Sequence, residues 1–116
     1  MNDSDKANLW DMLRAARQVT EYVSGRRFAD LESSQLLRDG VERQLEIIGE
    51  AARRISPEFR EAHADIPWTK IIAQRNVIAH EYGDIKLEWV WLVATQRVPE
   101  LIALLEPLIP PLPEDE

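Results

Sequence analysis

The chain has 116 residues, which is enough for one domain with a modest core, and its lack of cysteine excludes disulfides, thiolate metal sites and a cysteine nucleophile. Its 14 basic and 21 acidic residues give a net charge of −7, which argues against a broad electrostatic interface with nucleic acid. No apolar run has the length needed to cross a bilayer and the first residues lack the form of a signal peptide, so we expect a soluble cytoplasmic protein with no membrane partner.

Long stretches of the chain carry the periodicity of amphipathic helices, and none carries the alternation of a strand. The first helix is predicted from Ser4, as its N-cap, to Val23, and Gly25 ends it. Its apolar stripe consists of Leu9, Met12, Leu13, Ala16, Val19 and Val23. The second helix is predicted from about Asp30 to Ile55. Its apolar stripe consists of Leu37, Val41, Leu45, Ile48, Ala52 and Ile55.

Two glycines, Gly40 and Gly49, lie inside the second predicted helix. Each costs about 1 kcal/mol of helix propensity relative to alanine. Such a cost is tolerated where another backbone must come close, so we expect tight helix contacts at both positions.

The middle of the chain contains two further start signals. Ser56 followed by Pro57 is typical of a helix N-terminus, so the segment after it is expected to form a short helix or turn. A third main helix is predicted from Pro67 to the break at Gly83 and Asp84.

The last helix is predicted from Lys86 to Leu108, with a kink near Thr95 to Val98 because Pro99 lacks an amide donor and clashes with the preceding turn. Together the elements predict an all-α fold, an up-down bundle of four main helices plus a short connecting helix. We expect one domain over residues 1–109, followed by a Pro-rich acidic tail over residues 110–116.

The third helix ends in the stretch RNVIAHEYGD, Arg75 to Asp84, which is unusually rich in polar groups with distinct chemistry. At 100° per residue, its polar side chains share one broad face, and the two smallest residues occupy the middle of that face. The pattern predicts a shallow notch with Ala79 and Gly83 as its floor. Its rim consists of Arg75, Asn76, His80 and Tyr82.

The rim residues are suited to phosphodiester cleavage in which the RNA 2′-hydroxyl is the nucleophile. Arg75 offers a planar, permanently charged fork for a phosphate, and His80 has an ordinary pKa near neutrality, which suits proton transfer. Asn76 lies one turn before His80 and could orient it. Tyr82 could donate a hydrogen bond, stack on a base or accept a modifying group. This chemistry needs no metal, and no carboxylates occur at metal-ligand spacing, so we expect no metal and no cofactor.

Such cleavage needs both a base and an acid. The chain has two histidines, and we interpret His63 as an exposed loop residue without a role, so each chain supplies one histidine, His80, to the site. A two-fold dimer would bring two copies of His80 and of Arg75 into one cleft. It would also concentrate positive charge locally. We therefore predict a homodimer with a shared active-site cleft.

The spacing Arg-x4-His-x-Tyr, here Arg75, His80 and Tyr82, with Asn76 beside it, resembles the signature of the HEPN superfamily in its HepT-like branch of ribonuclease toxins. The flanking stretches VERQLEIIGEAARRIS and IPWTKIIAQRNVIAHEYGDI, followed by WVW, are also similar to that family, and the likeness covers most of the chain from Asp39 onward. One departure is Gln74, which stands where relatives commonly carry an apolar residue.

The resemblance implies a dimeric HEPN-like helical bundle and a metal-independent endoribonuclease acting on RNA, with Arg75 and His80 as its catalytic residues. It also implies a cognate antitoxin, a minimal nucleotidyltransferase. In similar toxin–antitoxin systems that partner blocks the toxin by AMPylation, the transfer of AMP onto the motif tyrosine, here Tyr82.

Other interpretations remain open at this stage. Arg75 could pair with Glu81 or Asp84 at an ordinary helix end. Charges on the second helix are most often solvated: Glu46 and Glu50 could line the cleft, and Arg53 and Arg54 could extend a phosphate path. Trp68, Trp89 and Trp91 fit core or dimer contacts better than base stacking. The net charge of −7 favours a non-catalytic dimer that binds nucleotide or a partner and accepts a modification, and a plain interaction bundle is the third alternative.

Overall fold

The computed structural model describes residues 1–80 and 86–109, with the backbone alone for residues 77–80. Within these ranges the protein is helical and contains no strand, which confirms the all-α fold. The elements are α1 (Asp3–Val23), α2 (Phe28–Ser33), α3 (Gln35–Arg53), α4 (Pro57–Ala62), α5 (Trp68–His80), α6 (Leu87–Leu92), the π-helical turn η1 (Val93–Arg97), α7 (Val98–Leu105) and the 3₁₀ turn η2 (Glu106–Leu108).

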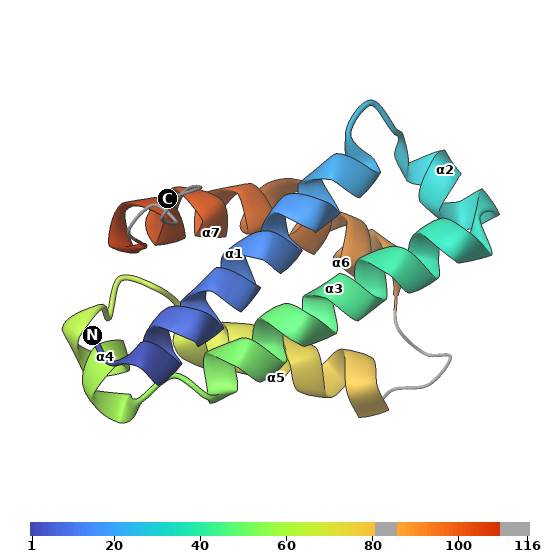
Figure 1. Cartoon of the computed structure of the whole chain (residues 1–116). Coiled ribbons are helices and arrows are strands. Elements are labelled where there is room, and N and C mark those ends of the chain that lie inside the picture. The colour runs from blue at the N-terminus through green and yellow to red at the C-terminus, as the bar shows by residue number, and fades with distance from the viewer. Residues whose placement is uncertain (81–85, 110–116) are drawn as a thin grey trace.

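The main helices run alternately up and down (Figure 1). Helix α3 packs against α1 on one side and α5 on the other, and α7 packs against the far side of α1. With α6 and α7 as one interrupted helix and α4 as the short connection, the predicted HEPN-like bundle is confirmed. The whole apolar stripe predicted for the first helix is buried in the core.

The start of α1 differs from its prediction, because Asn2 and not Ser4 is the N-cap. The Asn2 Oδ1 accepts a hydrogen bond of 2.6 Å from the Asp5 amide. Asp5 is buried, and its two carboxylate oxygens accept bonds from the Ser56 amide at 2.8 Å and the Ser56 hydroxyl at 2.6 Å. The same hydroxyl accepts from the Phe59 amide, so Ser56 caps α4 as predicted. One short network thus fixes the start of α1 to the start of α4.

The single helix predicted from about Asp30 to Ile55 is wrong, because the chain breaks at Ser34 into α2 and α3. Ser34 is extended, with φ −121° and ψ 108°, and its hydroxyl accepts from the Leu37 amide at 3.0 Å. The side chain of Arg38 donates to the carbonyl oxygen of Leu31 at 3.1 Å, and this bond satisfies a carbonyl that has no donor within α2. The serine hydroxyl competes with the helical backbone for hydrogen bonds, which makes a break at Ser34 possible. The break is favoured because α2 buries Leu31 completely in the core.

The last helix is interrupted where the kink was predicted, in the form of the wide turn η1. Pro99 lies in the first turn of α7 and cannot donate to the carbonyl of Thr95, so the backbone widens ahead of it. The Thr95 hydroxyl donates to the Trp91 carbonyl oxygen at 2.7 Å within the same region.

The two glycines of α3 lie at close helix contacts, as expected. A Cβ at Gly40 would lie 3.2 Å from the ring of Tyr22 on α1. A Cβ at Gly49 would overlap the side-chain stem of Arg75 on α5. Both helices that flank α3 therefore approach it at a glycine.

Candidate functional site

The RNVIAHEYGD motif begins on the last two turns of α5, where the structure describes Arg75 and Asn76 in full. His80 is the last residue of α5, five residues after Arg75, which is about 7.5 Å further along the helix axis. The His80 side chain lies outside the described residues, as do Tyr82 and Gly83 entirely. The predicted notch is therefore described at Arg75 and Asn76 alone.

Arg75 projects toward α3 and forms an ion pair with Glu50. Its Nη2 lies 3.1 Å from the Glu50 Oε2, and both side chains are about three-quarters buried, with exposed fractions of 25% and 27%. The distance is that of an ion pair, but the angles are not those of a hydrogen bond, since the buried Oε2 has no hydrogen-bond donor among the described residues. The Arg75 Nη1 donates to the Asn76 Oδ1 at 3.3 Å.

The side chain of Arg75 reaches Glu50 because the preceding residue of α3 is a glycine. Any larger residue at Gly49 would occupy the space of the Arg75 stem. The stem of Arg75 therefore packs on the backbone of α3 at Gly49, and its guanidinium lies beside Glu50. The sequence predicted a close approach at Gly49 without indicating its partner.

Glu50 also contacts two other arginines. Its Oε1 lies 3.6 Å from the Arg53 Nη2 and 3.4 Å from the Arg54 Nη2. One carboxylate thus faces three guanidinium groups, two from α3 and one from α5. One turn earlier on α3, the Arg43 Nη1 lies 3.6 Å from the Glu46 Oε1.

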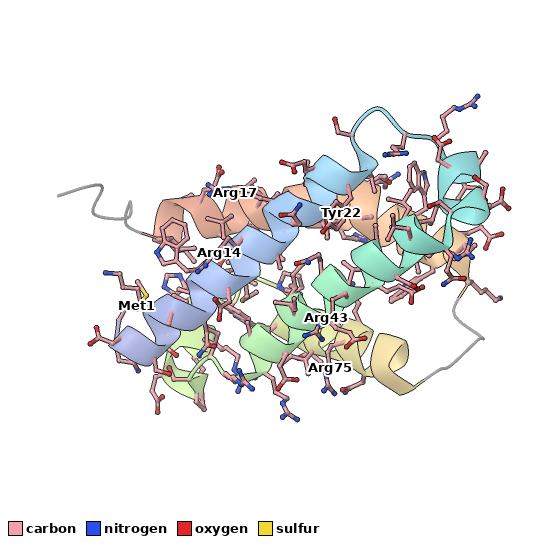
Figure 2. The ribbon with its side chains drawn as sticks, turned by 45° about the vertical axis from the view of Figure 1, so that its right-hand side comes forward. Met1, Arg14, Arg17, Tyr22, Arg43 and Arg75 are labelled. Atoms are coloured by element: carbon pink, nitrogen blue, oxygen red, sulfur yellow. The ribbon has the colours of Figure 1, made fainter. Side chains whose placement is uncertain are left out.

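These side chains surround a polar pocket of about 360 Å³ on the exposed side of α3. Figure 2 shows two of its arginines, Arg43 on α3 and Arg75 on α5, on the same side of the molecule. Its lining residues are Asp11, Arg43, Glu46, Ile47, Glu50, Ala51, Arg54 and Arg75. Guanidinium groups bind phosphates through paired N–H donors, so the pocket has the chemistry of an anion site.

A second, larger hollow of about 620 Å³ separates α5 from the α6–α7 helix. Apolar side chains such as Leu45, Ile71 and Leu101 form much of its wall, and Trp89 borders it. Its size exceeds that of the polar pocket, but neither Arg75 nor Asn76, the two predicted site residues whose side chains the structure describes, lines it. We therefore place the candidate site at the polar pocket.

His63 lies in the turn after α4, as predicted, but it is half-buried and not exposed, because it stacks on Phe59 with ring centroids 4.3 Å apart. Trp68 was expected to lie in the core or at a dimer contact, and it is buried in the core. Glu50 was considered as a residue that could line the cleft but was not selected, because nothing in the sequence indicates its contact with Arg75.

The alternative in which Arg75 pairs with Glu81 or Asp84 falls on residues outside the described ranges. The described partner of Arg75, Glu50, is on another helix. Within residues 1–80 and 86–109, no helix is both long and apolar enough to cross a membrane.

Comparison with known proteins decides the family. The family described as "Ribonuclease HepT-like" matches residues 12–108, which include all of α3 and α5. The chain belongs to the HepT-like ribonuclease family. No solved structure matches the HepT-like chain.

Three relatives of the HepT-like chain carry ribonuclease names. "Putative RNase MJ1380" of Methanocaldococcus jannaschii is 34% identical over 83% of this chain and 88% of its own length. "Putative RNase TTE0752" of Caldanaerobacter subterraneus subsp. tengcongensis is 34% identical over 78% and 80%. "Probable ribonuclease HepT" of Thermococcus cleftensis is 30% identical over 93% and 98%.

Proposed function

We propose that this HepT-like chain is a metal-independent endoribonuclease toxin that cleaves RNA through attack of the 2′-hydroxyl on the adjacent phosphate. The observation that carries the proposal is the fixed position of Arg75, held by Glu50 and Asn76 beside a polar pocket, five residues before His80. The ribonuclease names of the relatives support RNA cleavage as the activity.

In the proposed reaction the 2′-oxygen forms a bond to phosphorus as the bond from phosphorus to the 5′-oxygen breaks. A base removes the proton of the 2′-hydroxyl, and an acid supplies a proton to the leaving 5′-oxygen. Arg75 binds the phosphate and stabilises the charge on its oxygens, and His80 transfers protons. Asn76 supports the site by accepting from Arg75. The products are a 2′,3′-cyclic phosphate and a 5′-hydroxyl.

The proposed active unit is a homodimer with a shared cleft. Each chain supplies one motif histidine, His80, while His63 caps α4 and stacks on Phe59. Two copies of His80 in one cleft would supply the base and the acid. Two copies of Arg75 in the same cleft would also supply local positive charge that a chain of net charge −7 otherwise lacks.

We further propose that a cognate minimal nucleotidyltransferase is the antitoxin and that it AMPylates Tyr82 in the cytoplasm. Tyr82 lies two residues after His80 in the sequence. An adenylate on its oxygen would add bulk and negative charge beside the proposed phosphate site, which would repel RNA.

The test of the catalytic proposal is cleavage of defined RNA by the purified protein, with and without a metal chelator. We expect cleavage that the chelator leaves unchanged, and cyclic phosphate ends. His80→Ala and Arg75→Ala should each lower the rate at least about 10²-fold. His63→Ala is the matched control and should retain the rate. Full cleavage by His80→Ala would contradict the proposed mechanism.

The alternative function, a non-catalytic module that binds nucleotide or a partner, is favoured by the acidic net charge. Tight nucleotide binding without RNA turnover by the unaltered protein would select it.

The antitoxin proposal is tested by the intact mass after co-expression with a candidate nucleotidyltransferase. We expect an increase by whole AMP units that Tyr82→Phe abolishes.

A further inference from the structure

The polar side of α3 carries more positive charge than the composition of the chain suggests. Arg43, Glu46, Glu50 and Arg54 follow one another at helical spacing along one stripe. Arg53 and Arg75 reach the same carboxylate from either side. Four arginines thus face two glutamates and Asp11 of α1, which lines the same pocket, an excess of one positive charge on a protein whose net charge is −7.

The arginines of α3 are placed to bind an external anion. The side chains of Arg43, Arg53 and Arg54 are 60–68% exposed. Their partners are less exposed: Glu46, which pairs with Arg43, is 33% exposed, and Glu50, which pairs with Arg53 and Arg54, is 27% exposed. The contacts of the arginines with the glutamates are 3.4–3.6 Å long, which leaves most of the arginine N–H donors directed to solvent. Exposed ion pairs of this kind are weak and exchange readily for a stronger partner.

The stripe is long enough for more than one phosphate. Arg54, the C-cap of α3, lies eleven residues after Arg43, which is about 16 Å along the helix axis. Both line the pocket that also contains Arg75, so the stripe is continuous with the residue proposed to bind the scissile phosphate.

We propose that Arg43 and Arg54 form an RNA subsite on α3 that binds backbone phosphates next to the one held by Arg75, with Arg53 at its edge. A phosphate replaces the Glu50 Oε1 at Arg53 and Arg54, while the Glu50 Oε2 keeps its ion pair with Arg75. Phosphates are the same in every sequence, so a subsite that contacts only phosphates reads no base and raises affinity for any single strand. This inference rests on the proposed function and extends it from one phosphate to a path.

The test measures binding of a fluorescein-labelled single-stranded RNA whose 2′-hydroxyls are all methylated, so that it cannot be cleaved. Anisotropy is recorded at several salt concentrations with the full-length protein. Arg43→Gln and Arg54→Gln should each weaken binding about three- to tenfold, the effect of one charge-assisted contact. Each should also reduce the dependence of log K on log salt by about 0.7, the value for one phosphate of a single strand.

Arg97→Gln is the matched control. Arg97 is 60% exposed and pairs with Glu100 three residues later, as Arg43 pairs with Glu46. It lies in η1 and lines the larger hollow between α5 and the α6–α7 helix, away from the polar pocket. This variant should bind the RNA as the unaltered protein does. Circular dichroism confirms that all variants are folded.

The outcomes separate the subsite from the enzyme. Weaker probe binding by both α3 variants supports the subsite even if the protein cleaves no RNA, which would refute the enzyme alone. Unchanged binding by both variants overturns the subsite even if cleavage is observed, and so does failure of the unaltered protein to bind the probe. Unchanged RNA binding with impaired capture of a co-expressed partner would also overturn it and assign the stripe to a protein contact.

Discussion

Gly49 on α3 lies directly beneath the side-chain stem of Arg75 on α5, and it leaves no room there for even a methyl group. The contact joins two helices at the point where the proposed phosphate ligand begins. A glycine in the middle of a 19-residue helix is thereby explained by the position of a side chain on its neighbour.

Replacing Gly49 by alanine should destabilise the protein, although alanine favours the helix by about 1 kcal/mol. The new Cβ would overlap the Cβ and Cγ of Arg75, so α5 must shift, at a cost of about 1–3 kcal/mol in the free energy of unfolding. Urea denaturation measures the loss. Gly40→Ala is the control in the same helix: its Cβ would meet only the half-buried ring of Tyr22 at 3.2 Å, and we expect a change below about 1 kcal/mol. Equal stabilities of the two variants would contradict the overlap.

Replacing Glu50 by glutamine should separate binding from turnover. The loss of one negative charge should tighten RNA binding. The turnover rate should fall about ten- to hundredfold, because Arg75 is no longer held by its ion pair. Single-turnover cleavage and anisotropy at one salt concentration measure the two effects. Glu46→Gln removes the same charge beside Arg43, and it should tighten binding without loss of rate. If Glu50→Gln cleaves as fast as the unaltered protein, Glu50 does not position Arg75.

Glu42 on α3 should make stability depend on pH. Its burial, and after that the nearby charge of Asp39, raise the pKa of the Glu42 carboxyl above its ordinary value of 4.5. A raised pKa in the folded protein means that this group stabilises the fold below pH 4.5 and loses that contribution as the pH rises through the folded pKa. Glu42→Gln should therefore have a higher Tm than the unaltered protein at pH 7 and no advantage well below pH 4.5. Calorimetry across this range checks the prediction, and an equal Tm at every pH would contradict it.

The contact between Asp5 and Ser56 should make Ser56 more important than an ordinary helix cap. Ser56→Ala removes the cap of α4 and a bond to a buried carboxylate, so we expect a loss of about 2–4 kcal/mol. Ser34→Ala removes the cap of α3 alone and should cost about 1 kcal/mol. Thermal or urea denaturation compares them. A similar loss in both would show that Asp5 contributes little.

The sequence predicted what depends on local pattern. Apolar spacing identified the buried stripe of α1, and Ser56 with Pro57 identified the start of α4. The break at Ser34 was not predicted, because serine is tolerated within helices and only the burial of Leu31 and the bond from Arg38 decide against continuation. The N-cap was misplaced by two residues because Asn2 and Ser4 are both good capping residues.

For the site, the motif located Arg75, but its partner could not be deduced. Glu50 is 25 residues earlier on another helix, and a charged residue on a long helix is usually solvated. Only the packing of α5 on α3 brings the two charges together. The contribution of Arg53 and Arg54 to the same carboxylate depends on that packing as well.

The wide turn η1 has a consequence for the last helix. The buried residues Val90, Ala94 and Val98 follow one another in steps of four, and in an ideal α-helix each such step rotates about 40° beyond one full turn. A turn that holds more residues than an α-helical turn absorbs this advance, so the halves before and after it both direct apolar side chains inward. The π-helical turn therefore sets the rotational offset between α6 and α7 with which both halves face the core.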